Sequence, residues 1–211
     1  MRGNGTGHSK FRAEIEIREL KEMSPRPKVG LDINAILDVA GQIADVEGMQ
    51  ELTLANLAKQ LGIRPPSLYN HFDGLAGLRK EMAIYGINRL YEELTHGAIG
   101  VAGDEAVLAI SKAYVNFARR HPGIYEATLM APEMGDEEVQ QAGAKVVELT
   151  VTVLRHYDLK DDTALHAVRG LRSILHGFSS LEQRGGFKME LDLNESLEII
   201  IKGFIHGMRD I

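Results

Sequence analysis

The sequence predicts an all-α fold. Apolar residues recur at helical spacing along most of the chain, and the alternating pattern that marks strands is nearly absent. Glycine and proline interrupt this pattern at intervals that fit the ends of separate helices. At 211 residues, the chain has room for one domain of ordinary size and a second, smaller one.

Composition and charge limit the class of protein. Hydrophobic residues make up 44% and charged residues 26% of the chain, as in soluble globular proteins. The lack of cysteine excludes disulfides, thiolate metal sites and a cysteine nucleophile, and it fits a reducing cytoplasm. No apolar run approaches the roughly 18 residues that cross a bilayer, and the N-terminus lacks an apolar signal segment. We therefore expect a cytoplasmic protein with no membrane partner.

The helical pattern divides the chain into successive elements. Thr53 is expected to cap the second helix, Gly62 to form the turn after it, and Pro65 to open a very short third helix. Asp161 or Asp162 should cap the helix that ends near 183. The expected helices span 31–47, 54–61, 65–71, 75–96, 104–120, a restart after 121–123 toward 130, 136–157, 162–183 and 193–208, the last opened by Asp192 with Glu195 in a capping box.

Residues 1–30 belong to none of these helices. Met23 and the three residues after it read like a natural protein start, so residues 1–22 are expected to be non-native or dispensable. The alternative is a charged helix over 11–23. Residues 23–30 include two bases, Arg26 and Lys28, and form a basic arm.

Residues 52–72 are the most informative segment. A capped helix of eight residues, a turn with glycine and a second short helix form a helix-turn-helix, in which the second helix protrudes and can enter a major groove. Pro65 and Pro66 suit the start of that second helix because they lack N–H groups, and their apolar end can contact a thymine methyl. Proteins that bind no DNA also contain such a pair of helices.

Polar side chains on or beside the second short helix are candidate DNA contacts. Ser67 and Asn70 are short hydrogen-bonding residues suited to base edges, whereas Tyr69 and His71 can donate to phosphates. Thr53, at a helix start, can offer both its hydroxyl and its amide to a phosphate. Each has a simpler interpretation, since Tyr69 could pack in the interior and Thr53 could act only as a cap.

Three stretches form a longer pattern: Ile-Leu-Asp-Val-Ala at 36–40, Gly48, and residues 52–72, which end in Leu-Tyr-Asn-His-Phe. With this pattern, the chain resembles the TetR/AcrR family of bacterial transcriptional regulators. The resemblance covers about residues 31–78. It implies a homodimer that binds a palindromic DNA operator and leaves it when a small-molecule inducer binds.

The resemblance also implies a division of the chain and a set of contacts. After the extension, a three-helix DNA-binding domain would occupy 31–76, and a helical effector-binding and dimerisation domain would occupy 77–211. Thr53, Arg64, Ser67, Tyr69 and His71 match family positions that contact DNA. The full set of candidate DNA contacts is Thr53, Arg64, Pro66, Ser67, Tyr69, Asn70 and His71.

The chain departs from the family beside this segment. Family members commonly carry a lysine shortly after the His-Phe pair, but residues 73–75 are Asp-Gly-Leu, and the nearest bases are Arg79 and Lys80. Residues 24–73 hold fewer bases than acids, and the formal net charge of the chain is -6. Because few bases can reach phosphates, we expect a shallow dependence of DNA binding on salt.

The C-terminal half carries a second resemblance. His-Gly-Phe at 176–178 and Gly-Gly-Phe at 185–187 are similar to the TetR subgroup whose C-terminal domain is named for a WHG (Trp/His-Gly) motif, although the chain has no Trp. Arg169, Arg172 and His176 form a polar line on an apolar helix. That line either borders a dimer bundle or faces an inducer cavity.

Two sets of residues are candidates for binding in this half. The last two helices are expected to pack against their symmetry mates as a four-helix bundle, because the final helix carries an apolar stripe too wide for one domain to cover. The aromatic and Met residues that could wall a cavity are equally consistent with an ordinary core. The cavity candidates are Tyr114, Phe117, Tyr125, Met130, Met134, Arg172 and His176, and the dimer candidates are Gly177, Leu197, Ile201, Phe204, Ile205 and Met208.

Signals for catalysis, metal and cofactors are weak. Residues 177–181 lack the second glycine and the preceding strand of a nucleophile elbow. The sequence contains no phosphate-binding loop and no His-Glu-x-x-His helix. His176 and His206 are better interpreted as packed histidines than as metal ligands. We expect no enzyme, metal site or cofactor; the alternative to a DNA-binding protein is a helical interaction module, which would leave the surface of residues 64–70 without a purpose.

Overall fold

A computed structural model of the chain describes residues 32–130, 136–160 and 162–210. Within these residues the chain forms helices and connecting loops and no strand, which confirms the all-α prediction. The extension, its basic arm with Arg26 and Lys28, and also Met134 and Asp161 lie outside the described residues. The described helices belong to one compact unit that begins at Ile33.

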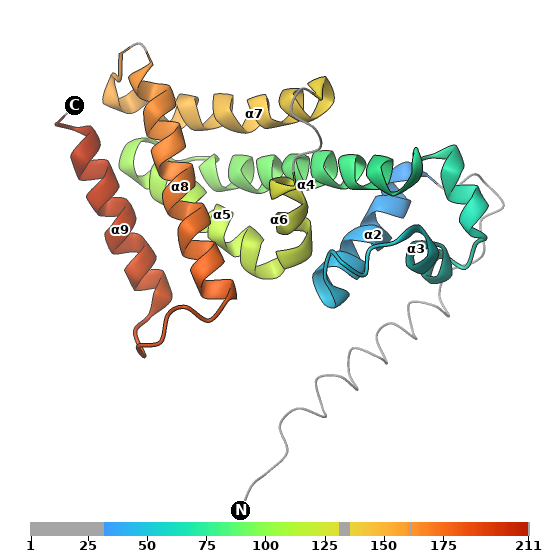
Figure 1. The fold of residues 1–211 in the computed structure, drawn as a ribbon. Helices are drawn as coiled ribbons and strands as arrows, with labels where there is room; N and C mark the ends of the chain where they lie inside the picture. The colour runs from blue at the N-terminus through green and yellow to red at the C-terminus, as the bar shows by residue number, and fades with distance from the viewer. Residues whose placement is uncertain (1–31, 131–135, 161, 211) are drawn as a thin grey trace, which may run out of the picture. The chain divides into compact units, whose positions relative to one another are not determined.

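The helices follow one another as the sequence predicts, with bounds that differ by a few residues (Figure 1). Two segments are 3-10 rather than α-helical: the third element, which two prolines open, and the end of the seventh expected helix. The elements are α2 (Ile33–Glu47), α3 (Leu54–Leu61), η1 (Pro65–Asn70), α4 (Gly74–Ala98), α5 (Gly103–Arg120), α6 (Pro122–Leu129), α7 (Glu137–Leu154), η2 (Arg155–Tyr157), α8 (Thr163–Gln183) and α9 (Leu193–Met208).

Helix caps account for several of these bounds. The Thr53 hydroxyl oxygen accepts the Asn56 amide at the start of α3, and Gly62 ends that helix in the left-handed region with φ 67°. Asp192 caps α9 through its carboxylate, as expected. Asp162 differs from the expectation: it precedes α8, but its side chain forms no cap hydrogen bond.

Helix α4 is the centre of the packing. It packs against α5, α6 and α7, and α5 in turn contacts α8 and α9 (Figure 1). The interior face of α4 is apolar and buried at intervals of three or four residues, as in an amphipathic helix. Helix α2 packs on α3, on α4 and on α6, so the short N-terminal helices touch the larger bundle through two of its helices.

Candidate DNA-binding surface and central cavity

The interior contacts of α3 and η1 set the orientation of the helix-turn-helix. Leu57 of α3 and Leu68 of η1 are fully buried, and Phe72, just after η1, is nearly so. The Ile63 amide donates to the carbonyl of Ala58 across the turn, which joins the turn to the end of α3. Because η1 buries only Leu68, the rest of this element is left on the surface.

The surface of η1 presents polar side chains with unused hydrogen-bonding groups. Tyr69 is 62% exposed, so it does not pack in the interior. Its hydroxyl and the side chains of Arg64, Ser67 and Asn70 form no hydrogen bond or ion pair with any described residue. The seven candidate DNA contacts are exposed without exception: Thr53, Arg64, Pro66, Ser67, Tyr69, Asn70 and His71.

Thr53 can serve as a cap and as a phosphate ligand at once. Its hydroxyl oxygen accepts the Asn56 amide at 3.1 Å, which uses one acceptor position of the hydroxyl. The hydroxyl hydrogen is not needed for that bond and remains available to an anion. Asn56 is fixed in turn by its side-chain amide, which donates to the carboxylate of Glu47 at 2.9 Å and thereby links α3 to the end of α2.

The bases near this surface differ in their freedom to bind phosphate. Lys80 forms ion pairs with Asp136 and Glu138, and the hydrogen bond that its ammonium donates to Asp136 contributes most to raising the pKa of Lys80. Arg79 and Lys59 are exposed and form no ion pair within the described part of the chain. Arg79 is therefore the base at the start of α4 that remains free for a phosphate.

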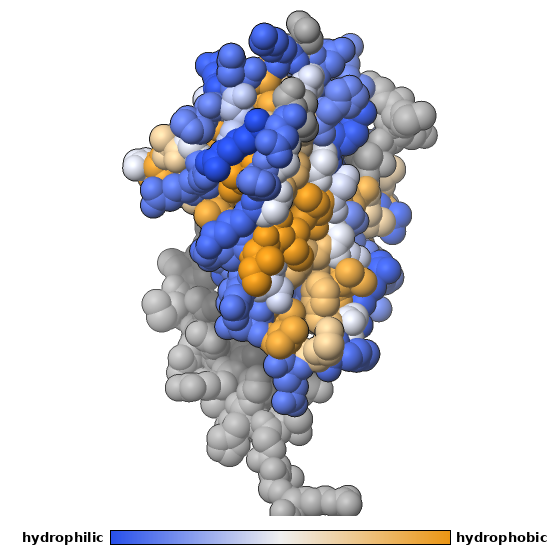
Figure 2. Space-filling view, turned by 90° about the vertical axis from the view of Figure 1, so that its left-hand side faces the viewer, coloured by the Kyte–Doolittle hydropathy of each residue, from blue (hydrophilic) through white to orange (hydrophobic). Residues whose placement is uncertain are grey.

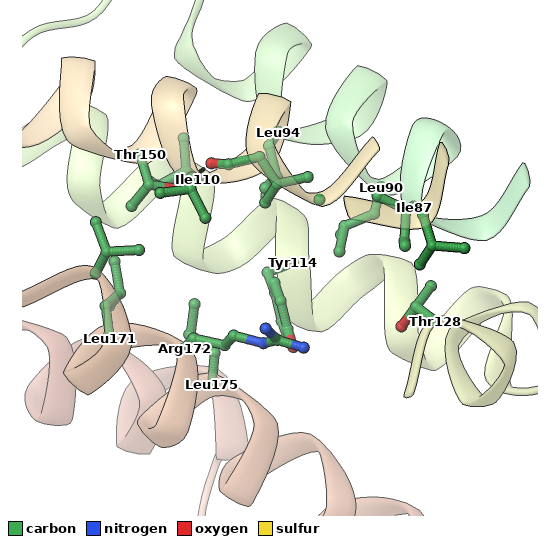
Figure 3. Close-up of a pocket in the computed structure, with 15 residues that line it drawn as sticks. Ile87, Leu90, Leu94, Ile110, Tyr114, Thr128, Thr150, Leu171, Arg172 and Leu175 are labelled. Atoms are coloured by element: carbon green, nitrogen blue, oxygen red, sulfur yellow. Dashed lines mark hydrogen bonds between the residues drawn. The ribbon is translucent and has the colours of Figure 1, made fainter. Parts of the chain in front are cut away.

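A cavity of about 260 Å³ lies among α4, α5, α6, α7 and α8 (Figure 3). Its walls are apolar apart from a few side chains, and Arg172 is the one charged group among the described residues that line it. The lining residues are Ile87, Leu90, Leu94, Ile110, Tyr114, Thr128, Val139, Gly143, Val146, Val147, Thr150, Val168, Leu171, Arg172 and Leu175.

A chain of polar groups runs from the cavity wall into the interior. The Arg172 guanidinium reaches toward the Tyr114 hydroxyl (Figure 3). That hydroxyl lies 3.0 Å from the Tyr125 hydroxyl, which is 2.8 Å from Nδ1 of His176. Burial raises the pKa of both tyrosines, so both hydroxyls are protonated and can donate at neutral pH.

The structure brings together some of the expected ligand residues and separates others. Tyr114 and Arg172 line the cavity, and Tyr125 with His176 lies behind them in the hydrogen-bonded chain. Phe117 is fully buried in the core and is not in the lining, and Met130 is 40% exposed after the end of α6. The α7 wall was not expected. The signal for it in the sequence is the apolar side of that helix, where Val139 and Val146 recur at helical spacing.

The face of α9 expected to form a dimer is covered within the protomer. The apolar stripe packs against the rest of the protomer, and each of its residues is at most 3% exposed: Leu197, Ile201, Ile205 and Met208. The expectation that a single domain could not cover this stripe is therefore wrong. Phe204 and Gly177 are partly exposed. Ile199 and Ile200 are 63% and 42% exposed on another side of α9. Figure 2 shows an apolar strip, bordered by hydrophilic residues, on the side where α9 lies in Figure 1.

None of the described helices is both long and apolar enough to cross a membrane. Within the same residues, no group of three or more His, Asp and Glu side chains is placed to hold a metal ion.

Comparisons with known proteins agree with this architecture. The family model described as "Bacterial regulatory proteins, tetR family" matches residues 36–82, and "Tetracyclin repressor-like, C-terminal domain" matches residues 107–204. The HTH-type transcriptional regulator YobS of Bacillus subtilis (strain 168) is 39% identical over 183 residues, which are 86% of this chain and 95% of YobS. The chain belongs to the TetR family.

Other relatives extend these similarities. The HTH-type transcriptional regulator Rv0681 of Mycobacterium tuberculosis is 37% identical over 156 residues, which cover 74% of this TetR-family chain and 72% of Rv0681. A crystal structure of a TetR variant from Acinetobacter baumannii AYE, in complex with minocycline, has the same fold. It aligns with a TM-score of 0.66 and 17% identity over 85% of this chain and 97% of the other. The chain is thus a TetR-family transcriptional regulator with a helix-turn-helix.

Proposed function

We propose that the protein is a dimeric repressor that binds a palindromic DNA operator and leaves it when a small molecule fills the central cavity. The observation that carries the proposal is the surface of η1, where a tyrosine and three polar side chains stand exposed without partners among the described residues. It acts by binding rather than catalysis, in the cytoplasm, where it has access to the chromosome.

The exposed side chains of the helix-turn-helix support a specific set of DNA contacts. Arg64, Pro66, Ser67 and Asn70 read base edges in the major groove, because they occupy the exposed start and side of η1. Thr53, Tyr69 and His71 bind phosphates and fix the register of the helix on the duplex. One element of six residues reads few bases, so two copies are needed, placed about 34–36 Å apart or a multiple of that distance.

The second copy binds on the α8 and α9 side, as a four-helix bundle. Exposed apolar side chains on α9 and in the loop before it would otherwise face water. A Cβ atom at Gly177 or Gly203 would meet nothing within 4 Å, so a partner helix can approach the backbone closely there. Gly177 belongs to the His-Gly-Phe run on which we base the WHG subgroup, and this run lies within the matched C-terminal region.

The cavity among α4 to α8 is the site for the inducer. Its size and apolar walls suit a small molecule. The minocycline complex of a structural neighbour supports ligand binding by a protein of this fold. A ligand that favours a spacing of the two helix-turn-helix units unlike that of successive grooves lowers the affinity for DNA by the same coupling energy, typically about 1–3 kcal/mol.

A gel-shift assay with DNA fragments from upstream of the gene tests the proposal. The protein should retain a fragment that contains an inverted repeat, and the Ser67→Ala, Tyr69→Ala double variant should bind it at least about tenfold more weakly. The matched control is Gln60→Ala, which removes an exposed polar side chain at the end of α3 and should leave binding unchanged. Full affinity in the double variant would exclude η1 as the reading element.

A further inference from the structure

We propose that the central cavity selects a monoanion with a mainly apolar body, and that Arg172 and Tyr114 hold the anionic group. This inference rests on the proposed ligand role of the cavity and names the chemical class that it takes. Its first support is charge: the lining contains one guanidinium and no carboxylate among the described residues. An arginine fork without a carboxylate partner is a site for a planar anion.

The charge of Arg172 is not neutralised by the protein. No described residue forms an ion pair with it, whereas Arg119, on α5, contacts Glu182 through its Nε at 2.9 Å. The Arg172 side chain instead extends along the cavity wall toward the Tyr114 hydroxyl (Figure 3). Arg172 is partly open to solvent. A guanidinium without a counterion at the wall of an apolar cavity still favours an anion and opposes a cation.

Tyr114 can add a second donor because its hydrogen-bonded chain can run in two directions. If Nδ1 of His176 accepts, Tyr125 donates to it, Tyr114 donates to Tyr125, and only an oxygen lone pair faces the cavity. If Nδ1 carries the hydrogen, each bond reverses, and the Tyr114 hydrogen points into the cavity beside Arg172. An anion stabilises the second direction because both donors then bind it.

The volume sets the size of the apolar body. At about 260 Å³, the cavity exceeds the roughly 150 Å³ that accepts benzene. It lies just below the roughly 300 Å³ at which pockets for drug-sized ligands begin. The ligand is therefore larger than one aromatic ring and smaller than a typical drug. Leu, Ile and Val side chains from α4, α5, α7 and α8 cover such a body.

Three probes of one shape and different charge test the proposal by calorimetric titration: para-butylbenzoate, the neutral para-butylbenzamide and the cationic para-butylbenzamidine. In the unaltered protein, the carboxylate should bind about tenfold more tightly than the amide, since a charge-assisted bond is replaced by a neutral one. The amidine should bind most weakly. An amide or amidine that binds as tightly as the benzoate, or failure of all three to bind at millimolar concentration, would overturn the proposal.

Variants on α8 assign the effect to the proposed side chains. Arg172→Gln should bring the affinities for benzoate and benzamide to within about twofold. The matched control is Arg169→Gln, one turn earlier on α8 and outside the lining, which should keep the preference. A preference that survives Arg172→Gln contradicts the proposal. DNA is absent from this assay, so failure here is separate from failure of the gel shift.

A second pair of variants tests the donor chain. Tyr114→Phe removes a donor beside the anion and should weaken benzoate binding several-fold without weakening benzamide to the same extent. Tyr125→Phe removes the next hydroxyl in the chain but leaves the Tyr114 hydrogen free to point into the cavity, so benzoate should bind at least as well as before. Equal losses of benzoate affinity in both variants would remove Tyr114 from the anion site.

Discussion

The carboxylate of Asp45, near the end of α2, holds the start of α6 through His121 and two backbone amides. One carboxylate oxygen lies 2.9 Å from Nδ1 of His121, and the other accepts the amides of Gly123 and Ile124, each at 2.9 Å. His121 occupies the position that caps α6 but supplies no side-chain cap bond. An acid of α2 therefore caps α6, a helix 76 or more residues further along the chain, where the unpaired amides of the helix start favour an anion.

Asp45→Ala should lower the free energy of unfolding by about 1–3 kcal/mol, because two amides at the start of α6 lose their acceptor in a half-buried place. Denaturation by urea measures this change. Asp73→Ala is the matched control: Asp73 precedes α4 but forms no cap bond, and its loss should change stability by less than about 0.5 kcal/mol. Similar losses in the two variants would show that the cap bonds of Asp45 contribute nothing.

The contact between α2 and α6 also depends on a missing side chain. A Cβ atom at Gly123 would lie 2.0 Å from the carbonyl oxygen of Ala44, which is rigid backbone. Gly123→Ala should therefore destabilise the protein by at least about 1 kcal/mol, as overpacking does. Gly143→Ala, on α7, meets nothing within 4 Å and should instead stabilise by up to about 1 kcal/mol. Thermal melts of both variants compare the two glycines directly.

Local signals in the sequence were sufficient for the helices and their ends. The helix caps involve Thr53, Gly62 and Asp192, and each of these residues bonds to backbone groups only two to four residues away. Their capping roles can therefore be predicted from the local sequence, without knowledge of the tertiary structure. The link between Asp45 and α6 could not be read in this way, because 76 to 79 residues separate the bonded groups. Nothing local distinguishes Asp45 from any other acid near a helix end.

The apolar sides of α7 and α9 show a second limit of prediction from the sequence. An apolar stripe predicts that a helix buries one face, but it does not say whether protein, ligand or a second subunit covers that face. On α9, Ile201 turned out to lie in the protomer core, whereas the neighbouring Ile200 is exposed. On α7, Val139 and Val146 line a cavity instead of a filled core. Arg172 was singled out as a polar group on an apolar helix, and Tyr114 as an aromatic residue that could wall a cavity; both line the cavity.

Lys80 should control the titration of Asp136. Its hydrogen bond is the main cause that holds the pKa of the Asp136 carboxyl below the ordinary value of 3.8, aided by the amides of Val139 and Glu138. Lys80→Met should shift that pKa upward toward 3.8, as measured by carboxyl carbon NMR. Lys112→Met, which removes a partner of Glu198 instead, should leave Asp136 unchanged. An Asp136 titration that is the same in Lys80→Met as in the unaltered protein would show that the pair is not formed in solution.

The sign of the stability change follows from this shift. A carboxyl whose pKa is lower in the folded state stabilises the fold at pH values above its unfolded pKa, and the contribution is lost as the pH falls through the folded value. The cap of α7 by Asp136 should thus persist at neutral pH and weaken only in acid. In Lys80→Met the weakening should begin at higher pH, detectable as faster exchange of the Glu138 amide under mildly acidic conditions.

A charge on the exposed side of α9 should separate the proposed dimer. Ile200→Asp places a carboxylate on a residue that is 42% exposed in the protomer, so it should fold normally but oppose burial against a second copy. Light scattering should report a monomer. Val46→Asp, at a residue of α2 that is 79% exposed, is the matched control and should remain dimeric.

The same experiment on the adjacent residue distinguishes an interface from a core. Ile201 is fully buried within the protomer, so Ile201→Asp leaves a charge without a partner in the interior. That variant should lose its cooperative melt or precipitate, rather than yield a folded monomer. If both Ile200→Asp and Ile201→Asp gave folded monomers, α9 would not pack against the protomer core as the structure shows. A folded dimer from Ile200→Asp would place the second copy elsewhere, and it would leave the exposed apolar strip of α9 for another partner.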